Sequence, residues 1–219
     1  DTSWNRVIGG NGIGVLVAET IEKFDFNNPS ASSASLVEIY QLIDALDAGH
    51  WKRIKLEETK KLLEACTGLY MEAVASNAAT TPTETEKISI EAINRSGIKV
   101  VLKAIQIDPL NQFEKKEIEL KNNQSHLFDV AVTIPTDIQQ TTPYWLLEKG
   151  SIGMYRVNNN KLIGMPESPR ALLVKFIVEF EGVPIEFSKA VVYKNNDPVK
   201  GEVYKPFQVL PEVSASFIE

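Results

Sequence analysis

Residues 7–14 read VIGGNGIG and lead into a predicted helix, so this run is a candidate for binding a nucleotide cofactor. A dinucleotide-binding turn requires the spacing Gly-x-Gly-x-x-Gly after a strand, with an acidic residue about twenty positions later. Gly10 and Gly12 fit the first two positions, but Val15 occupies the third, and residues 28–35 contain no acid. The run therefore predicts a flexible entry into a helix, whose free N–H groups could still hold an anion.

Metal-ligating residues are scarce in this sequence. The two histidines, His50 and His126, fall in separate predicted elements, whereas zinc hydrolases draw several histidine and carboxylate ligands from neighbouring loops. Residues 25–30, DFNNPS, begin like a calcium-binding loop, but Pro29 and Ser30 replace an oxygen ligand and the turn glycine. We therefore expect this chain to hold no metal and no cofactor.

Nucleophile motifs are also missing. Ser151 lies in the run GSIG, which lacks the Gly-x-Ser-x-Gly spacing of a nucleophile elbow. Cys66 is the single cysteine, so the chain can form neither an internal disulfide nor a thiolate metal site. Cys66 falls on the apolar stripe of a predicted helix, which indicates an inert core thiol.

Three aromatic residues, Tyr144, Trp145 and Tyr155, lie in an irregular part of the chain and are the candidate binding residues. Aromatic faces on loops can stack on sugar rings or on other flat apolar ligands. The alternative is that Trp145 and its neighbours fill one end of a hydrophobic core, as large aromatic side chains commonly do.

Up to about residue 78, apolar residues recur at helical spacing, which predicts helices over residues 12–24, 34–48 and 51–75. The second and third should form an antiparallel hairpin at Gly49. Three helices in residues 1–78 make a thin core. We therefore expect them to pack against the rest of the chain or against a missing neighbour.

After residue 78 the apolar residues alternate, as in strands, and ten of the eleven prolines lie beyond residue 80. The fold class is thus α+β, with residues 79–219 forming an antiparallel immunoglobulin-like β-sandwich. The chain lacks the cysteine pair of antibody domains, so the expected likeness is one of architecture. The predicted strands cover residues 88–93, 98–107, 118–120, 128–134, 154–157, 172–180, 183–193, 203–210 and 213–218.

The charge of the chain argues against some partners. Its formal net charge is −6 and its sequence pI is near 5.2, whereas nucleic acids and anionic membranes require a basic surface. The longest apolar runs are too short to span a bilayer. We expect no nucleic-acid partner and no membrane span. Because the chain starts at Asp1 without a methionine or a signal-like segment, we also expect it to have been processed, trimmed or excised from something longer.

Several segments together resemble one family. They are GGNGIG at residues 9–14, WKRIKLEE at 51–58, ACTGL at 65–69, EAINRS at 91–96, TPYWL at 142–146, and Tyr193 followed by DPVKGEVYKP at 197–206. Across nearly the whole chain they resemble the region downstream of the catalytic domain in large bacterial PIG-L (LmbE-like) deacetylases. The predicted sandwich also looks like the accessory β-domains beside glycoside-processing enzymes.

The resemblance implies a role for the chain. The family removes N-acyl groups from amino sugars with zinc, using a His-Pro-Asp-Asp segment and a later His-x-x-His, and neither motif occurs here. No catalytic residue is carried over. The resemblance therefore implies a non-catalytic C-terminal accessory region, located in the periplasm or outside the cell. Its expected partners are the catalytic domain of the same polypeptide, which would hold the zinc, and a glycan.

Two other functions stay open at this stage. The chain could be an independent carbohydrate-binding module with Tyr144 and Trp145 on its binding face. It could also be a stand-alone enzyme with an unrecognised site, although nothing in the sequence favours this.

Overall fold

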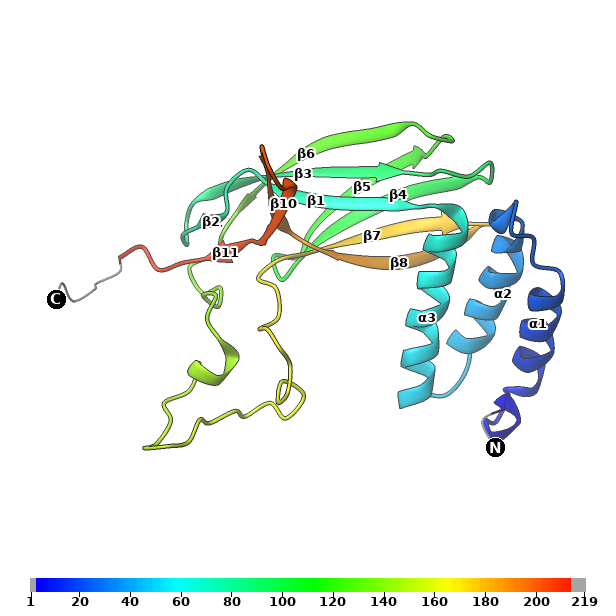
Figure 1. Cartoon of the computed structure of the whole chain (residues 1–219), viewed down its shortest axis with the longest axis horizontal. Helices are drawn as coiled ribbons and strands as arrows, with labels where there is room; N and C mark the ends of the chain where they lie inside the picture. Colours follow the sequence, from blue (N-terminus) through cyan, green and yellow to red (C-terminus); the bar gives the residue numbers. More distant parts are fainter. Residues whose placement is uncertain (1–2, 214–219) are drawn as a thin grey trace.

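Three α-helices precede the strands in the computed structural model, which describes residues 3–213 (Figure 1). Helices α1 (Asn11–Glu22), α2 (Ser33–Asp44) and α3 (His50–Thr67) are joined by short connections, and the 3-10 turns η1 (Trp4–Arg6) and η2 (Pro29–Ser32) precede α1 and α2. The first two helices confirm the sequence prediction to within a few residues. Among residues 3–213, no helix is both long and apolar enough to cross a bilayer.

The third predicted helix, 51–75, is wrong at its end. Helix α3 stops at Thr67 because Gly68 takes the left-handed conformation, with φ of 58°. The N–H of Leu69 then donates to the carbonyl of Glu64 at 3.0 Å, as in a glycine-capped helix end. The chain continues directly into strand β1 (Tyr70–Ala75). The change from helix to strand therefore comes at Gly68 and not near residue 78.

The strands form two main sheets. The first has the order β10-β9-β1-β3-β6 and the second the order β5-β4-β7-β8, while β2 and β11 pair separately. Pairing is antiparallel except between β1 and β9 and between β2 and β11. The strand bounds are β2 Ala79–Thr80, β3 Thr85–Ile93, β4 Val100–Asp108, β5 Gln112–Glu119, β6 Ser125–Thr133, β7 Leu173–Phe180, β8 Val183–Ala190, β9 Val192–Asp197, β10 Gly201–Pro206 and β11 Gln208–Val209.

Alternating side chains from both main sheets meet in one core, as in a β-sandwich. On β3 the residues Ile88, Ile90 and Ala92 are fully buried, and on β7 so are Val174 and Phe176. The helices join the same core through a smaller set of buried residues: Ile13, Leu36, Val37, Ile39, Ile43 and Leu63.

Several predicted strands differ from the observed ones. The strand predicted over 118–120 is too short, because β5 runs Gln112–Glu119. This strand lies at the edge of its sheet, and its many polar residues obscure the alternation of apolar and polar positions. Residues 154–157 form no strand, and only an isolated bridge joins Ser151 to Met154. Apart from Val213, which is in no strand, the prediction over 213–218 lies outside the described residues.

Two long predicted strands are divided where the chain changes sheet. Residues 183–193 split at Val191, which is buried and donates its N–H to Leu172 at 3.0 Å. The chain leaves the second sheet after β8 and enters the first as β9. Residues 203–210 split in the same way at the buried Phe207, between β10 and β11.

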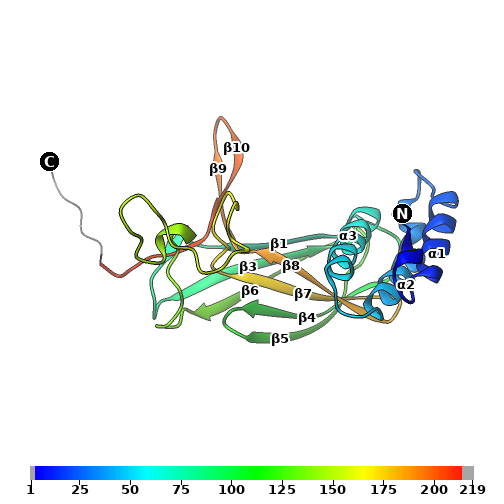
Figure 2. The ribbon, with the colours of Figure 1, turned by 90° about the horizontal axis from the view of Figure 1, so that it is seen from below.

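Three parts project from the sandwich. The helices lie at one end and the long segment 134–171, which contains the 3-10 turn η3 (Tyr144–Leu146), lies at the other, both on the same side (Figure 1). The β9–β10 hairpin projects separately (Figure 2). The sandwich therefore lies between the helices and the segment that carries η3.

Candidate functional site

A pocket of about 280 Å³ lies where three segments meet, at the end of the sandwich away from the helices. The segments are 141–145, 166–171 and 206–208, and Trp145 is the aromatic residue on the wall that faces solvent. Four prolines also line this pocket, which we call the Trp145 pocket: Pro143, Pro166, Pro169 and Pro206.

Hydrogen bonds hold the walls of the Trp145 pocket together. The Ser168 hydroxyl donates to the carbonyl of Thr142 at 2.8 Å, which joins the first and second segments. Thr141 donates its N–H to the carbonyl of Val209 at 2.8 Å, and its hydroxyl accepts the N–H of Val209 at 3.0 Å. This second pair joins the first segment to β11. The pocket is thus built from distant parts of the chain that are fixed to each other.

Tyr144 and Trp145 lie together but have different environments. The Tyr144 ring is buried, and its hydroxyl donates to the carbonyl of Met165 at 3.2 Å. The Trp145 ring packs edge-to-face on it, with centroids 4.9 Å apart, and stays partly exposed. Tyr144 is therefore buried beneath the loop, outside the main core cluster, while Trp145 stays partly exposed.

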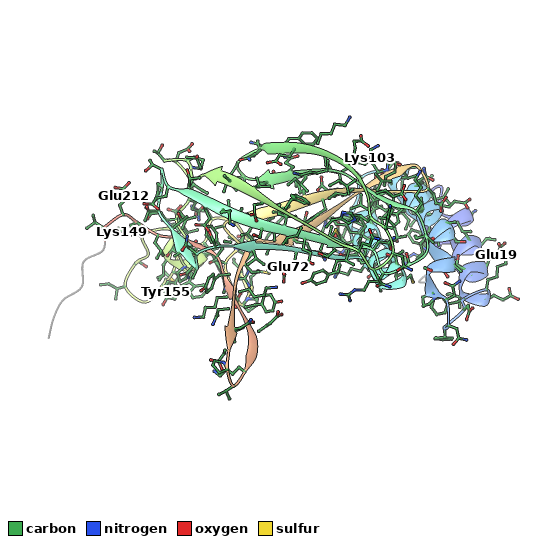
Figure 3. The ribbon with its side chains drawn as sticks, turned by 90° about the horizontal axis from the view of Figure 1, so that it is seen from above. Glu19, Glu72, Lys103, Lys149, Tyr155 and Glu212 are labelled. Carbon is green, nitrogen blue, oxygen red and sulfur yellow. The ribbon has the colours of Figure 1, made fainter. Side chains whose placement is uncertain are left out.

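Tyr155, the third candidate, is elsewhere. Its side chain is 69% exposed and does not line the Trp145 pocket, although it belongs to the same long segment (Figure 3). The structure thus brings together two of the three candidate residues.

Polar groups beside Trp145 were not identified from the sequence. The Arg170 guanidinium forms an ion pair with Glu167 at 2.6 Å, and both residues line the Trp145 pocket. Gln208 also lines the pocket, and its exposed side-chain amide has no hydrogen-bond partner among the described residues. No local pattern could have grouped Gln208 with Trp145, because they meet only through folding.

A second, larger cavity of about 580 Å³ lies among the helices and is mostly apolar. Leu36, Ile39 and Ile43 of α2 form its floor. The two walls come from α1 and α3, and Trp4 and Phe26 also contribute. We call it the helix groove. The wall residues from the two helices are Val17, Thr20, Ile21, Lys55, Glu58, Thr59, Leu62 and Cys66.

Cys66 is partly buried where it lines the helix groove. Burial raises the pKa of its thiol, which keeps the sulfur protonated at neutral pH. This agrees with the expectation of an unreactive packing residue.

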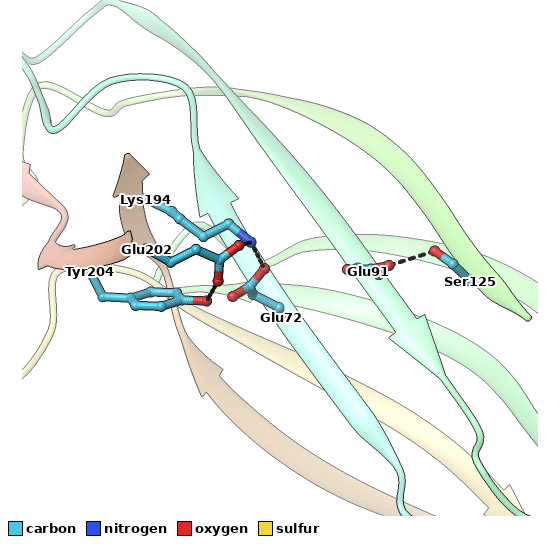
Figure 4. Close-up of polar contacts among 6 residues, drawn as sticks. All are labelled: Glu72, Glu91, Ser125, Lys194, Glu202 and Tyr204. Atoms are coloured by element: carbon cyan, nitrogen blue, oxygen red, sulfur yellow. Dashed lines mark hydrogen bonds and ion pairs between the residues drawn. The ribbon is translucent and has the colours of Figure 1, made fainter. Parts of the chain in front are cut away.

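A cluster of three charged side chains and one tyrosine joins β1, β9 and β10 (Figure 4). The Lys194 ammonium is 2.8 Å from the Glu72 carboxylate and 3.9 Å from that of Glu202, and the Tyr204 hydroxyl donates to Glu202 at 3.0 Å. We call these four residues the hairpin cluster.

The pKa shifts in the hairpin cluster all point away from neutrality. Burial would raise the pKa of Glu72, but hydrogen bonds from Lys194, Tyr204 and Tyr70 outweigh it and lower the pKa. The hydrogen bond to Glu72 raises the pKa of Lys194, and burial together with the two carboxylates raises that of Tyr204. A general acid or base works best with a pKa near the operating pH. The hairpin cluster is therefore arranged to hold the β9–β10 hairpin on β1.

The two histidines lie apart. His50 begins α3 and packs edge-to-face on Trp51, while His126 lies on β6 opposite Ala92. Within residues 3–213, no three His, Cys, Asp or Glu side chains gather in a way that could hold a metal ion.

Comparisons with known proteins identify no family. No family model matches the chain, and no curated protein matches it. Among solved structures there is a likeness to Pseudomonas fluorescens alkylpurine DNA glycosylase AlkC bound to DNA containing an abasic site analog, at 10% sequence identity and a TM-score of 0.28. The match covers 80% of this chain and 50% of that protein's chain, so this chain corresponds to about half of it. At this score the likeness carries no argument about fold or function.

Proposed function

We propose that this chain is a non-catalytic accessory region of an enzyme of the PIG-L (LmbE-like) deacetylase kind. Its helix groove would dock the catalytic domain of the same polypeptide. The observation that carries the proposal is the helix groove itself, a mostly apolar cavity of about 580 Å³ between α1 and α3 whose α2 floor is buried and whose rim is exposed. Three helices in this arrangement present the empty fourth position of a helix bundle.

The rim of the helix groove is apolar as well as its floor. Ile21 is 72% exposed, Leu62 is 51% exposed and Phe26 is 89% exposed. Covering such side chains stabilises a complex by up to about 2 kcal/mol each. An amphipathic helix or apolar ridge of the catalytic domain fits this groove by the helix-in-groove mode of recognition.

The position of Trp4 supports docking by a preceding domain. Trp4 lines the helix groove, so a domain that preceded it would be connected close to this surface. In this proposal the zinc belongs to the catalytic domain, the substrate is a glycan, and the protein is periplasmic or secreted.

For the sandwich we propose the immunoglobulin-like topology. The strands β1, β3 and β6 would correspond to strands A, B and E, and β4, β7 and β8 to C, F and G. Two observations support this: β1-β3-β6 are neighbours in the first sheet, and β4-β7-β8 are neighbours in the second. In this topology β9 and β10 are additions that extend the first sheet beyond β1.

The size of the native protein tests the accessory role. An antibody raised against this 24.4 kDa chain should detect a much larger polypeptide in the source cells. Sequencing upstream should then find the His-Pro-Asp-Asp segment. A band near 24.4 kDa would refute the proposal and leave the independent carbohydrate-binding module as the better function.

Hydrogen exchange on the full-length enzyme tests docking itself. Residues 17–26 should exchange at least tenfold more slowly in the full-length enzyme than in the isolated chain. The double variant Ile21→Lys and Leu62→Lys should remove this protection, because it places charges on both walls. Val15→Lys is the matched control, since Val15 is exposed on α1 but does not line the helix groove. Equal exchange in the isolated chain and the full-length enzyme would contradict docking at this surface.

A further inference from the structure

We propose that the Trp145 pocket is a binding site for a neutral saccharide. The site is independent of the docking proposed above, because the segments that line it lie at the opposite end of the sandwich from the helices that form the helix groove (Figure 1).

The chemistry of the walls favours a sugar. Trp145 offers a partly exposed aromatic ring on which the apolar face of a pyranose can lie. Around it stand the planar polar groups of Arg170, Glu167 and Gln208, which can donate to and accept from hydroxyl groups. Because Arg170 and Glu167 neutralise each other at 2.6 Å, the pair offers hydrogen bonds without a net charge. These features select a flat, neutral, hydroxyl-rich ligand over an ionic one.

The size of the pocket suits a small ligand. Its volume of about 280 Å³ lies just below the range of roughly 300–1,000 Å³ that is typical of sites for drug-sized molecules. One or two sugar rings match this space better than a folded peptide segment.

The Trp145 pocket is also preorganised. The Tyr144 ring supports the Trp145 ring from behind, at a centroid distance of 4.9 Å. The Ser168–Thr142 and Thr141–Val209 hydrogen bonds fix the three segments, and the four prolines restrict their backbones. A site that is already ordered loses less entropy when its ligand binds.

Retention of the isolated chain on an array of immobilised neutral oligosaccharides tests the proposal. The probes are gluco-, manno-, galacto- and N-acetylglucosamine oligomers of six units. We expect retention on at least one of them that persists in 1 M NaCl. Trp145→Ala should lower it at least tenfold while the melting temperature changes by less than about 4 °C. No retention on any probe, or retention that salt abolishes, would overturn the proposal.

Two further variants sharpen this test. Tyr155→Ala removes an exposed aromatic ring outside the pocket and should leave retention unchanged. If Trp145→Ala unfolds the chain, Gln208→Ala serves instead, because its exposed side chain has no partner in the described structure. Retention that depends on Tyr155 but not on Gln208 would contradict the site. The Ile21→Lys and Leu62→Lys double variant should bind the same probe normally, so failure of docking and failure of the saccharide site are distinguishable.

Discussion

Replacing Glu72 with glutamine should loosen the β9–β10 hairpin and destabilise the protein. The hairpin joins the sandwich through a parallel ladder of only two residue pairs, Val74–Val192 and Ala75–Tyr193. The hairpin cluster adds the contact between Glu72 and Lys194, at 2.8 Å (Figure 4). The Glu72 side chain is 11% exposed, so solvent screens this ion pair less than it screens the surface pairs.

The size of the effect follows from these contacts. A hydrogen bond to a charged group contributes about 1.5–3 kcal/mol, and one partner here, Lys194, is partly exposed. Glutamine keeps the shape and one acceptor but loses the charge. We therefore expect Glu72→Gln to lower the free energy of unfolding by about 1–2 kcal/mol, which corresponds to a melting temperature roughly 2–8 °C lower in a domain of this size.

The pH dependence has a definite sign. The folded-state pKa of Glu72 is lowered from its ordinary value of 4.5, so its stabilising effect is fully present above that pH. The effect is lost as the pH falls through the folded-state pKa. The difference in unfolding free energy between wild type and Glu72→Gln should thus be constant from about pH 6 to 8 and shrink below about pH 4.5.

Urea unfolding at a series of pH values, followed by circular dichroism, measures this difference. Glu202→Gln is the matched control, because Glu202 belongs to the same cluster but its side chain is 56% exposed. The control should cost less than about 0.5 kcal/mol. A Glu72→Gln variant as stable as wild type at pH 7, or a difference that grows as the pH falls, would refute this account.

Two more changes should affect stability. Gly68→Ala should cost about 1–2 kcal/mol in urea unfolding, because Gly68 has φ of 58° and an added Cβ would lie 2.9 Å from Cβ of Arg95. Gly97→Ala, with nothing near its added Cβ, should cost less than about 0.5 kcal/mol, and equal costs would contradict the argument. Glu86→Ala should cost about 3 kcal/mol, since this buried carboxylate accepts hydrogen bonds from Ser76 and Asn77 at 2.8–3.1 Å. Replacing the exposed neighbour Glu84 with alanine should leave the free energy of unfolding nearly unchanged. A similar loss of stability in that variant would show that the hydrogen bonds of Glu86 are not the cause.

The helices and the central strands could be predicted because their apolar residues face a single core. Ile88, Ile90 and Ala92 alternate on β3, and all three are buried. The end of α3 could not be placed from spacing alone, because Tyr70 and Ala73 continue a helical stripe while Met71, Ala73 and Ala75 form a strand pattern. Gly68 was the local signal for the end of the helix, since glycine commonly follows the last turn of a helix.

The sheet changes and the Trp145 pocket could not be predicted, because they depend on distant contacts. Val191 looks like one more apolar residue in a strand until its bond to Leu172 is seen. Trp145 could be identified as a candidate from its type and its irregular surroundings. Gln208 could not, because it is far along the chain and is brought to the Trp145 pocket by the pairing of β11 with β2 and by the hydrogen bonds between Thr141 and Val209.

The distance between the helix groove and the Trp145 pocket bears on the kind of glycan that the pocket could bind while a catalytic domain is docked in the groove. The nine-residue strand β3 runs through the sandwich that separates them, and nine residues of strand extend about 30 Å. The helices and the segment carrying Trp145 project from the same side, so a docked domain and a bound saccharide would share that side (Figure 1). A single sugar in the Trp145 pocket would lie about 30 Å from the helix groove and would not contact the groove itself. If both proposals hold, the pocket therefore serves a polymeric or surface-attached glycan, held at one point while the enzyme acts at another.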